Sequence, residues 1–394
     1  MKILIINSGS SSIKFQLMDM PSERLICSGL VERIGYDDAI INYKPNGDSY
    51  KQTYPIKSHK DGLNKIVELL LDADKGVINN TNEIEVVGHR VVHGGNSFSN
   101  TTLITAEVKE KIHEYAALAP LHNPGNLEGI LVSEEIFPSA KQVAIFDTAF
   151  HQTIPEKAKK YAIPNELYEK HGIQVYGFHG TSHQYVTEKA VAYLGMGSSK
   201  IITIHLGNGC SMTAVKDGKS IDTSLGFTPS NGLVMGSRSG DIDHAVIFHL
   251  VNNLKYSLDE VKTLLTNKSG MLGLTGKMDL RDIEAEAEKG NKECILALAI
   301  STYRIKKYIG AYIAAMNGLD AIVFSAGIGE NSSVIRGLVC SDLEVFGIYL
   351  DAAKNEVKSS ELREINKSES KVKILVIPTN EELEIAKQAF DLLN

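Results

Sequence analysis

Three glycine-rich stretches of the chain carry polar residues that could bind phosphate. The first, "INSGSSSIKF" at residues 6–15, follows the apolar run "KILI". Its backbone N–H groups and hydroxyls can surround phosphate oxygens, with Lys14 adding positive charge and Asn7 a neutral oxygen. The second, "HLGNG" at 205–209, lacks bulky side chains and lets a ligand approach the backbone. The third, "FSAGIGENSS" at 324–333, predicts a strand, a glycine-rich turn and the polar start of a helix. Gly327 and Gly329 could admit a flat base or ribose there, and the alternative is a plain strand–helix turn.

Two arginines lie in similar surroundings. Arg90 precedes a glycine pair in "GHRVVHGG", and Arg238 lies within the Gly/Ser loop "MGSRSGDID". A guanidinium in such a loop is well placed for two parallel hydrogen bonds to an oxyanion. The alternative for each is an arginine in solvent or in a salt bridge.

Asp147 and His179 are further candidates. Asp147 ends the buried-strand pattern "KQVAIFD", a position that suits Mg²⁺ binding, catalysis or the capping of a turn. His179 and His183 are four residues apart in "YGFHGTSHQYV", but no thiol or carboxylate accompanies them, so zinc is disfavoured. A histidine that donates to an oxyanion is the better interpretation. Thr181 or Ser182 could cap the helix that follows.

The elements that position these residues alternate between strand and helix patterns, which predicts an α/β protein. Apolar strand patterns occur at 2–7, 141–147, 200–206, 321–327 and 371–378, and helical periodicity at 59–73, 105–118, 257–267, 281–290, 295–316 and 380–393. The first loop is followed by "FQLMDMP", which alternates and meets a proline, so it joins two strands and is not a P-loop. Residues 2–17 and 200–215 have the same pattern, which predicts an internal duplication.

Bulk composition limits the function classes. The length of 394 residues predicts two domains, and the net charge of −7 argues against nucleic-acid binding. The four cysteines form no C-x-x-C pair, which favours a reducing, cytoplasmic location over a disulfide or zinc scaffold. The initial apolar run is too short for a signal peptide, and no apolar run reaches the length that a membrane span needs.

The motifs "NSGSSSIKF", "HRVVHGG", "FDTAFH", "YGFHGTSH", "HLGNG", "GLVMGSRSGDID", "SAGIGENS" and "IPTNEEL" together resemble the acetate kinase family, in order and from Lys2 to about Leu393. The resemblance implies a two-domain actin-like ATPase fold with a duplicated ribonuclease-H-like core and an active-site cleft between the domains. One domain would comprise 1–150 and the C-terminal helix 380–394, and the nucleotide-binding domain 151–379.

The resemblance also implies cytoplasmic homodimers and a place in acetyl-CoA biosynthesis. The reaction would be the reversible, direct in-line transfer of phosphate from ATP to acetate, which gives acetyl phosphate and ADP. Mg²⁺ would be the metal, with Mn²⁺ as a substitute.

The same resemblance assigns roles to individual residues. Asn7 and Glu381 would place Mg²⁺, although Glu381 can also be read as a first-turn glutamate favoured by the helix dipole. Arg90, Arg238, His179 and Asp147 would serve the transfer. The residues that would bind nucleotide are Lys14, His205, Leu206, Gly207, Asn208, Gly209, Asp279, Leu280, Arg281, Gly327, Ile328, Gly329, Glu330 and Asn331. Arg90 would bind acetate, and the pocket for its methyl group would comprise Val92, Leu121, Phe178 and Pro229.

The chemistry agrees with these roles. A carboxylate nucleophile is already ionised at pH 7, so no general base is needed, and Asp147 is expected to position Mg²⁺ or the arginines. A methyl-sized pocket predicts acetate over propionate, because one methylene in such a pocket is worth ~1–3 kcal/mol.

Two alternatives stay open. The nearer one is a kinase of propionate or butyrate. The other is a nucleotide-driven switch of the same superfamily, such as an actin-like filament protein or a heat-shock chaperone. The chain ends at "AKQAFDLLN", so we expect no appended peptide-binding domain.

Overall fold

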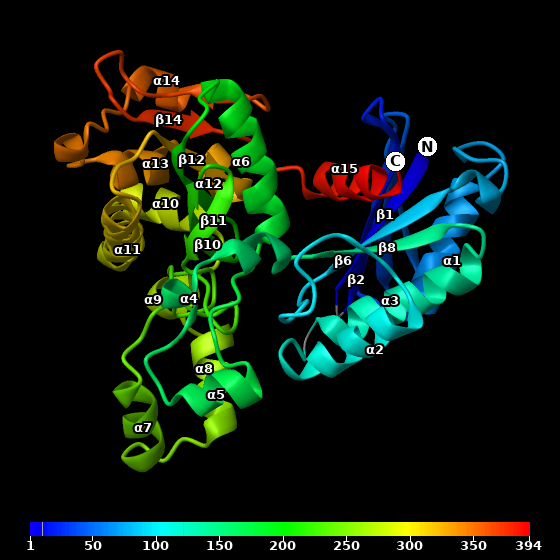
Figure 1. Ribbon diagram of the computed structural model, residues 1–394, viewed down its shortest axis with the longest axis horizontal. Helices are drawn as coiled ribbons and strands as arrows, with labels where there is room; N and C mark the ends of the chain where they lie inside the picture. Colours follow the sequence, from blue (N-terminus) through cyan, green and yellow to red (C-terminus); the bar gives the residue numbers. More distant parts are fainter. Residues whose placement is uncertain (10, 121) are drawn as a thin grey trace. The chain divides into compact units, whose positions relative to one another are not determined.

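The computed structural model describes residues 1–9, 11–120 and 122–394, and the chain forms two compact units. The first unit comprises Met1–Phe150 and Asn380–Asn394, and the second comprises His151–Thr379 (Figure 1). In these residues no helix is long and apolar enough to cross a membrane.

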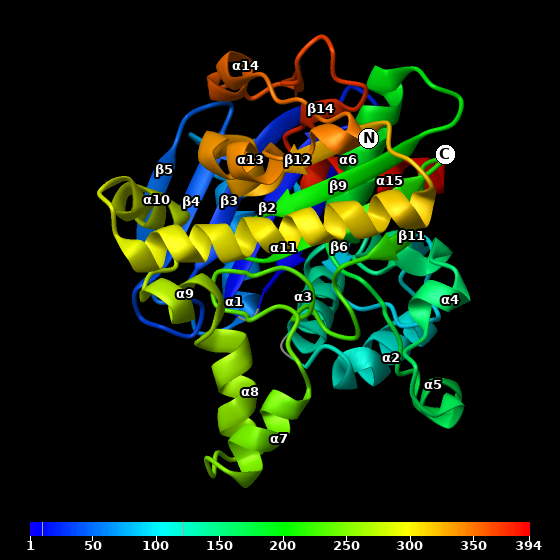
Figure 2. The ribbon, with the colours of Figure 1, turned by 90° about the vertical axis from the view of Figure 1, so that its left-hand side faces the viewer.

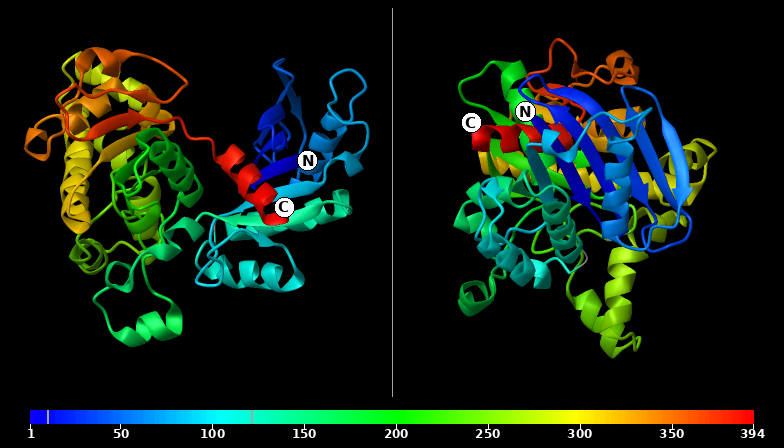
Figure 3. Two further views of the ribbon diagram at one scale, coloured as in Figure 1. Left: turned by 45° about the horizontal axis from the view of Figure 1, so that its top comes forward. Right: turned by 90° about the vertical axis from the view of Figure 1, so that its right-hand side faces the viewer.

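The first unit contains a sheet with the strand order β5-β4-β3-β2-β1-β6-β8-β7 (Figure 3, right). Its strands are β1 (Lys2–Ser8), β2 (Ser12–Asp19), β3 (Arg24–Glu32), β4 (Ala39–Pro45), β5 (Tyr50–Tyr54), β6 (Val86–Val91), β7 (Thr102–Leu103) and β8 (Lys141–Phe146). Strand β1 pairs antiparallel with β2 and parallel with β6, which in turn pairs parallel with β8. The first glycine-rich loop is therefore the turn of a hairpin, as its sequence predicted.

Helices bury both faces of this sheet. The helices of the unit are α1 (His59–Leu70), α2 (Ala106–Glu114), α3 (Asn123–Ile136) and α15 (Glu381–Leu393), with short 3₁₀ turns at Thr81–Glu83, Tyr115–Ala117 and, at the boundary, Ala149–Thr153. Leu4 and Ile6 of β1 share a core with Leu63 and Ile66 of α1. Successive strand residues face opposite sides, and α15 packs against β1, β6 and β8 (Figure 1, red). The end of the chain thus completes the first unit.

The second unit repeats this topology, with the strand order β11-β10-β9-β12-β14-β13. Its strands are β9 (Lys200–Leu206), β10 (Cys210–Lys216), β11 (Lys219–Thr223), β12 (Ala321–Ser325), β13 (Arg363–Glu364) and β14 (Lys373–Val376). In each unit three consecutive antiparallel strands are extended by two strands parallel to the first, in the spatial orders β3-β2-β1-β6-β8 and β11-β10-β9-β12-β14. The predicted duplication is therefore confirmed by topology.

The second unit also contains helices. They are α4 (Glu156–Lys159), α5 (Asn165–His171), α6 (Gly180–Leu194), α7 (Ala245–Asn252), α8 (Leu258–Asn267), α9 (Gly270–Thr275), α10 (Leu280–Glu288), α11 (Lys292–Met316), α12 (Ala326–Asn331), α13 (Ser333–Cys340) and α14 (Ala352–Glu356), with a 3₁₀ turn at Glu344–Phe346. Helix α6 packs on β9 and β12, and the long α11 lies along β9 and β10 (Figure 2).

Two local expectations were wrong. The stretch after β12 is not a glycine-rich turn, because helix α12 begins directly at Ala326, whose φ of +62° makes the sharp change of direction. Neither Thr181 nor Ser182 caps α6, because its N-cap is His179, with a φ of +57° and no capping hydrogen bond from the side chain. Both side chains are buried, and the Ser182 hydroxyl lies 2.8 Å from both His205 Nδ1 and Thr379 Oγ1, so tertiary contacts took precedence over capping.

Candidate active site

In the first unit, an arginine and three oxygen-bearing side chains meet at the carboxyl ends of neighbouring parallel strands. Arg90 Nε donates to Asp147 Oδ1 and Oδ2 at 3.0 and 3.1 Å, and Nη2 donates to Oδ2 as well. Arg90 Nη1 donates to Asn7 Oδ1 at 3.4 Å, and Nε lies 3.8 Å from Glu381 Oε2. Ligands of open α/β sheets bind at such strand ends.

The charges in this group are unequal, because two carboxylates surround one guanidinium. Burial by itself lowers the pKa of Arg90, but Asp147 and Glu381 outweigh it and raise that pKa. Burial raises the pKa of Glu381; Arg90 opposes this rise, and Asp147 adds to it. The group would therefore be stabilised by a further cation.

Two other predicted residues of this unit have structural partners. Lys14 Nζ forms an ion pair with Glu382 at 2.5 Å. Glu381 is the first residue of α15, after the N-cap Asn380, so its charge lies at the positive end of the helix dipole. The same carboxylate also lies beside Arg90. Val92 is buried in this unit, and Leu121 lies outside the described residues.

In the second unit, Arg238 and His179 border the same glycine. A Cβ atom built on Gly209 would lie 3.3 Å from His179 Nε2 and 3.8 Å from Arg238 Nη1, so both groups border this glycine and a side chain there would crowd His179. Arg238 Nη1 donates to the carbonyl of Pro229 at 2.8 Å. Within the described residues Arg238 has no carboxylate partner, and burial lowers its pKa. Phe178, beside His179, is buried.

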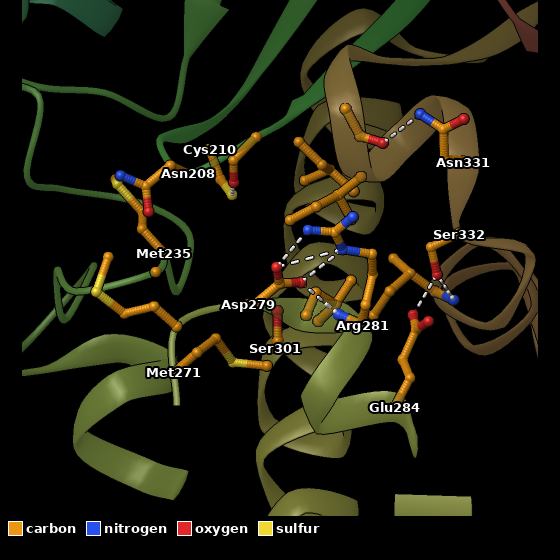
Figure 4. A pocket seen from close by; sticks show the side chains of 18 of the residues that line it. Asn208, Cys210, Met235, Met271, Asp279, Arg281, Glu284, Ser301, Asn331 and Ser332 are labelled. Atoms are coloured by element: carbon orange, nitrogen blue, oxygen red, sulfur yellow. Dashed lines mark hydrogen bonds and ion pairs between the residues drawn. The ribbon is translucent and has the colours of Figure 1, made fainter. Parts of the chain in front are cut away.

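A cavity of about 600 Å³ opens beside this glycine loop (Figure 4). Nine predicted nucleotide residues line it, namely Leu206, Gly207, Asn208, Asp279, Leu280, Arg281, Gly327, Ile328 and Asn331. Asn208 of this loop lies on one side of the cavity, and Asp279 and Arg281 form an ion pair on another. A Cβ on Gly236 would lie 2.1 Å from Asn208 Oδ1, so a larger residue there would displace the Asn208 side chain.

Four predicted nucleotide-binding residues of this unit do not line the cavity. His205 and Gly209 stand beside it in the loop, whereas Gly329 and Glu330 serve the fold. The carbonyls of Gly329 and Glu330 accept from the buried Arg336, and Glu330 Oε1 accepts from the backbone of Thr379.

Sequence reasoning missed much of the cavity wall. Additional lining residues are Cys210, Val234, Met235, Gly236, Met271, Met278, Glu284, Ser301, Ile305, Ser332, Ile335 and Lys358. Many belong to helices α9 to α11 and α13, and only the amphipathic pattern of those helices could have indicated them. Glu284 is fixed by the hydroxyl of Ser332, which donates to it at 2.5 Å.

The residues are suitable for Mg²⁺, although no group of three or more His, Cys, Asp or Glu in the described residues forms a metal site alone. Asn7, Glu381 and Asp147 offer the hard oxygen atoms that Mg²⁺ prefers, and the two carboxylates have one guanidinium between them. Mg²⁺ commonly takes one or two carboxylates and completes its coordination with water and substrate phosphates.

The repeated sheet, the glycine loops and the anion-binding groups are features of a phosphotransferase built on a duplicated α/β fold. The chain belongs to the acetokinase family, whose profile matches residues 2–387. It is 65% identical over 393 residues to an acetate kinase of Flavobacterium johnsoniae, with all of both chains covered. It is 50% identical over 398 residues to acetate kinase 2 of Clostridium perfringens, again with full coverage.

Solved structures agree with these relatives. Porphyromonas gingivalis acetate kinase superposes with a TM-score of 0.95 at 44% identity, covering all of both chains. A propionate kinase from Francisella tularensis superposes with a TM-score of 0.93, also at 44% identity, covering 99% of each chain.

Proposed function

We propose that the chain transfers the terminal phosphoryl group of ATP to acetate, reversibly and directly in line, to give acetyl phosphate and ADP. The observation that carries this proposal is the pair His179 and Arg238 at Gly209, beside a cavity large enough for a nucleotide. A half-buried guanidinium with no described carboxylate partner is a suitable group to receive an oxyanion. Membership of the acetokinase family supplies the acceptor class.

We propose different roles for the charged residues of the two units. The cavity in the second unit would hold the nucleotide, and Arg238 and His179 would donate to the phosphoryl oxygens, where charge builds up during transfer. Arg90 would orient the acetate carboxylate, which needs no base because it is ionised at pH 7. The bidentate contact of Asp147 with Arg90 supports a positioning role for this carboxylate.

Mg²⁺ would be held by Asn7 and Glu381, with Mn²⁺ as a substitute. When bound, the ion would shield the charge of the phosphates. Its charge would also offset that of Glu381 beside Asp147.

We propose that the pocket for the methyl group comprises Val92, Phe178, Pro229 and Leu121. A second candidate acceptor is propionate, because the chain is as similar in sequence to a propionate kinase as to one acetate kinase of known structure. Because an extra methylene changes binding by only ~1–3 kcal/mol, we expect acetate to be preferred and propionate to react slowly.

The decisive experiment traps acetyl phosphate as its hydroxamate. Purified protein, ATP and Mg²⁺ should give hydroxamate only when acetate is present, less with propionate and least with butyrate. Omission of Mg²⁺ and replacement by Mn²⁺ test the metal. Acetate-independent ATP hydrolysis would overturn the proposal in favour of a nucleotide-driven switch.

We also propose that the protein is a cytoplasmic homodimer. The four cysteines are free, as expected for a reducing compartment. Six large apolar side chains within 242–258 are exposed, namely Ile242, Val246, Phe248, Leu254, Tyr256 and Leu258. Such a segment favours burial against a second copy. Light scattering should give twice the 43.0 kDa chain mass, and a monomer would contradict this.

A further inference from the structure

Three hydrogen bonds link a buried threonine to His179. Thr203 Oγ1 lies 2.7 Å from His183 Nδ1, and His183 Nε2 lies 2.7 Å from Ser211 Oγ. Ser211 Oγ lies 2.9 Å from His179 Nδ1. Thr203, His183 and Ser211 are fully buried. We call this series, from Thr203 through His183 and Ser211 to His179, the histidine relay.

The fold brings the relay together from three elements. His179 and His183 are one helical turn apart at the start of α6, which packs on β9. Thr203 lies on β9, and Ser211 lies opposite His205 on the antiparallel β10. Thr203 and His205 are two residues apart and so share one face of the sheet, toward which α6 presents its first turn.

Each link allows only certain hydrogen positions. Ser211 has a single hydroxyl hydrogen, so it donates to one of its two histidines and accepts from the other. Burial, and next the neighbouring His151 and His205, holds the pKa of His183 well below its usual value, so this ring is neutral and carries one N–H. Two orders result, one running from Thr203 to His179 and one running in the opposite direction.

The hydroxyl of Thr203 decides between them. If His179 donated to Ser211, His183 would donate to Thr203, and the Thr203 hydrogen would need a further acceptor. The described residues provide none, and a buried donor without a partner costs about 1–3 kcal/mol. In the other order Thr203 donates to His183, His183 to Ser211, and Ser211 to His179 Nδ1, so every hydrogen of the relay has an acceptor.

We propose that the histidine relay fixes His179 as the neutral tautomer with its proton on Nε2, and that Ser211 is the positioning residue. This proposal deepens the proposed function, in which His179 donates to the phosphoryl group. Nε2 is the nitrogen beside Gly209 and Arg238. The positive charge of Arg238 disfavours a second proton on the ring, and the stacked His205, at 4.4 Å between ring centroids, limits its rotation.

The tautomer can be measured directly on the wild-type chain. In ¹⁵N NMR of histidine-labelled protein, the His179 signals, assigned by comparison with His179→Gln, should show N–H at Nε2 and an acceptor nitrogen at Nδ1. A proton on Nδ1 in the neutral ring would overturn the proposal. This measurement needs no active variant and is independent of whether His179 takes part in catalysis.

Kinetics test the positioning role. Ser211→Ala should lower kcat about 10- to 100-fold, as expected when a catalytic group is misplaced, with KM for ATP unchanged. The matched control is Ser220→Ala, which removes another buried serine–histidine hydrogen bond, of 3.0 Å to His151 Nδ1. An equal loss of kcat in both variants would overturn the role of Ser211. If His179→Gln kept full kcat, the proposed function of His179 would fail, whereas the tautomer result would stand on its own.

Discussion

The two candidate arginines have opposite surroundings, although both lie in glycine-containing stretches. Arg90 in the first unit contacts Asp147, Asn7 and Glu381, so its charge is more than balanced. Arg238 in the second unit donates to a backbone carbonyl and lies near His179, with no carboxylate partner among the described residues. One site has excess negative charge and the other has excess positive charge.

This difference explains how a chain of net charge −7 can handle anionic substrates. The first unit suits a cation and a single carboxylate held by a fixed arginine. The second suits phosphate, because its guanidinium has not been neutralised by an acid. Local pairing of charges, and not the total charge, determines what each site attracts.

The largest expected effect separates the two arginines. Arg238→Ala should lower kcat about 10²–10³-fold, the usual loss of an oxyanion donor, with little change in unfolding free energy. Arg90→Ala should lower kcat and also destabilise the protein by about 3 kcal/mol, because the buried Asp147 carboxylate loses the guanidinium charge beside it. Steady-state kinetics and urea unfolding measure both quantities. Equal destabilisation by the two substitutions would contradict the comparison.

A smaller effect is expected from Asp147→Asn. The amide keeps one oxygen for Arg90, so kcat at saturating Mg²⁺ should fall less than about tenfold, while the Mg²⁺ needed for half activity rises. Titration with Mg²⁺ at saturating acetate distinguishes the two quantities. Loss of activity with an unchanged Mg²⁺ requirement would contradict a role for Asp147 in placing the ion.

Local sequence patterns predicted the main strands and helices well. The contacts of the site depend on residues that are distant in sequence. The strands at 2–7 and 200–206 and the helix at 380–393 are confirmed, because apolar periodicity specifies buried elements. The hairpins around Gly9 and Gly207 followed from alternation alone.

Local patterns could not predict which side chains distant in sequence contact one another. Nothing local indicates that Lys14 pairs with Glu382, or that Thr203 and Ser211 lead to His179. The cavity wall was similarly only partly predictable, because Met271, Glu284 and Ser301 belong to helices without a motif.

The acyl pocket should give a moderate effect. Val92→Ala enlarges the proposed methyl pocket, so the acetate-to-propionate ratio of kcat/KM should fall at least about fivefold, in line with ~1–3 kcal/mol for one methylene. The matched control is Val91→Ala, which removes the same atoms from a neighbouring valine packed in the core around Phe146. An unchanged ratio in Val92→Ala, or an equal change in Val91→Ala, would refute the pocket assignment.

The smallest effect is on stability and comes from Glu381→Gln. Because the pKa of Glu381 is raised in the folded state, the native protein binds more protons than the unfolded chain between the two pKa values, and stability falls as pH rises through that interval. Removing the charge should therefore raise the Tm of metal-free protein by about 2–4 °C at pH 7, for a gain of about 1 kcal/mol, and flatten its dependence on pH. At pH 4 the wild type and the variant should differ little. With Mg²⁺ and ADP present the wild type should be the more stable protein, since only the wild type keeps the carboxylate for the ion. If the variant were less stable than the wild type without metal, Arg90 would fully compensate the charge of Glu381.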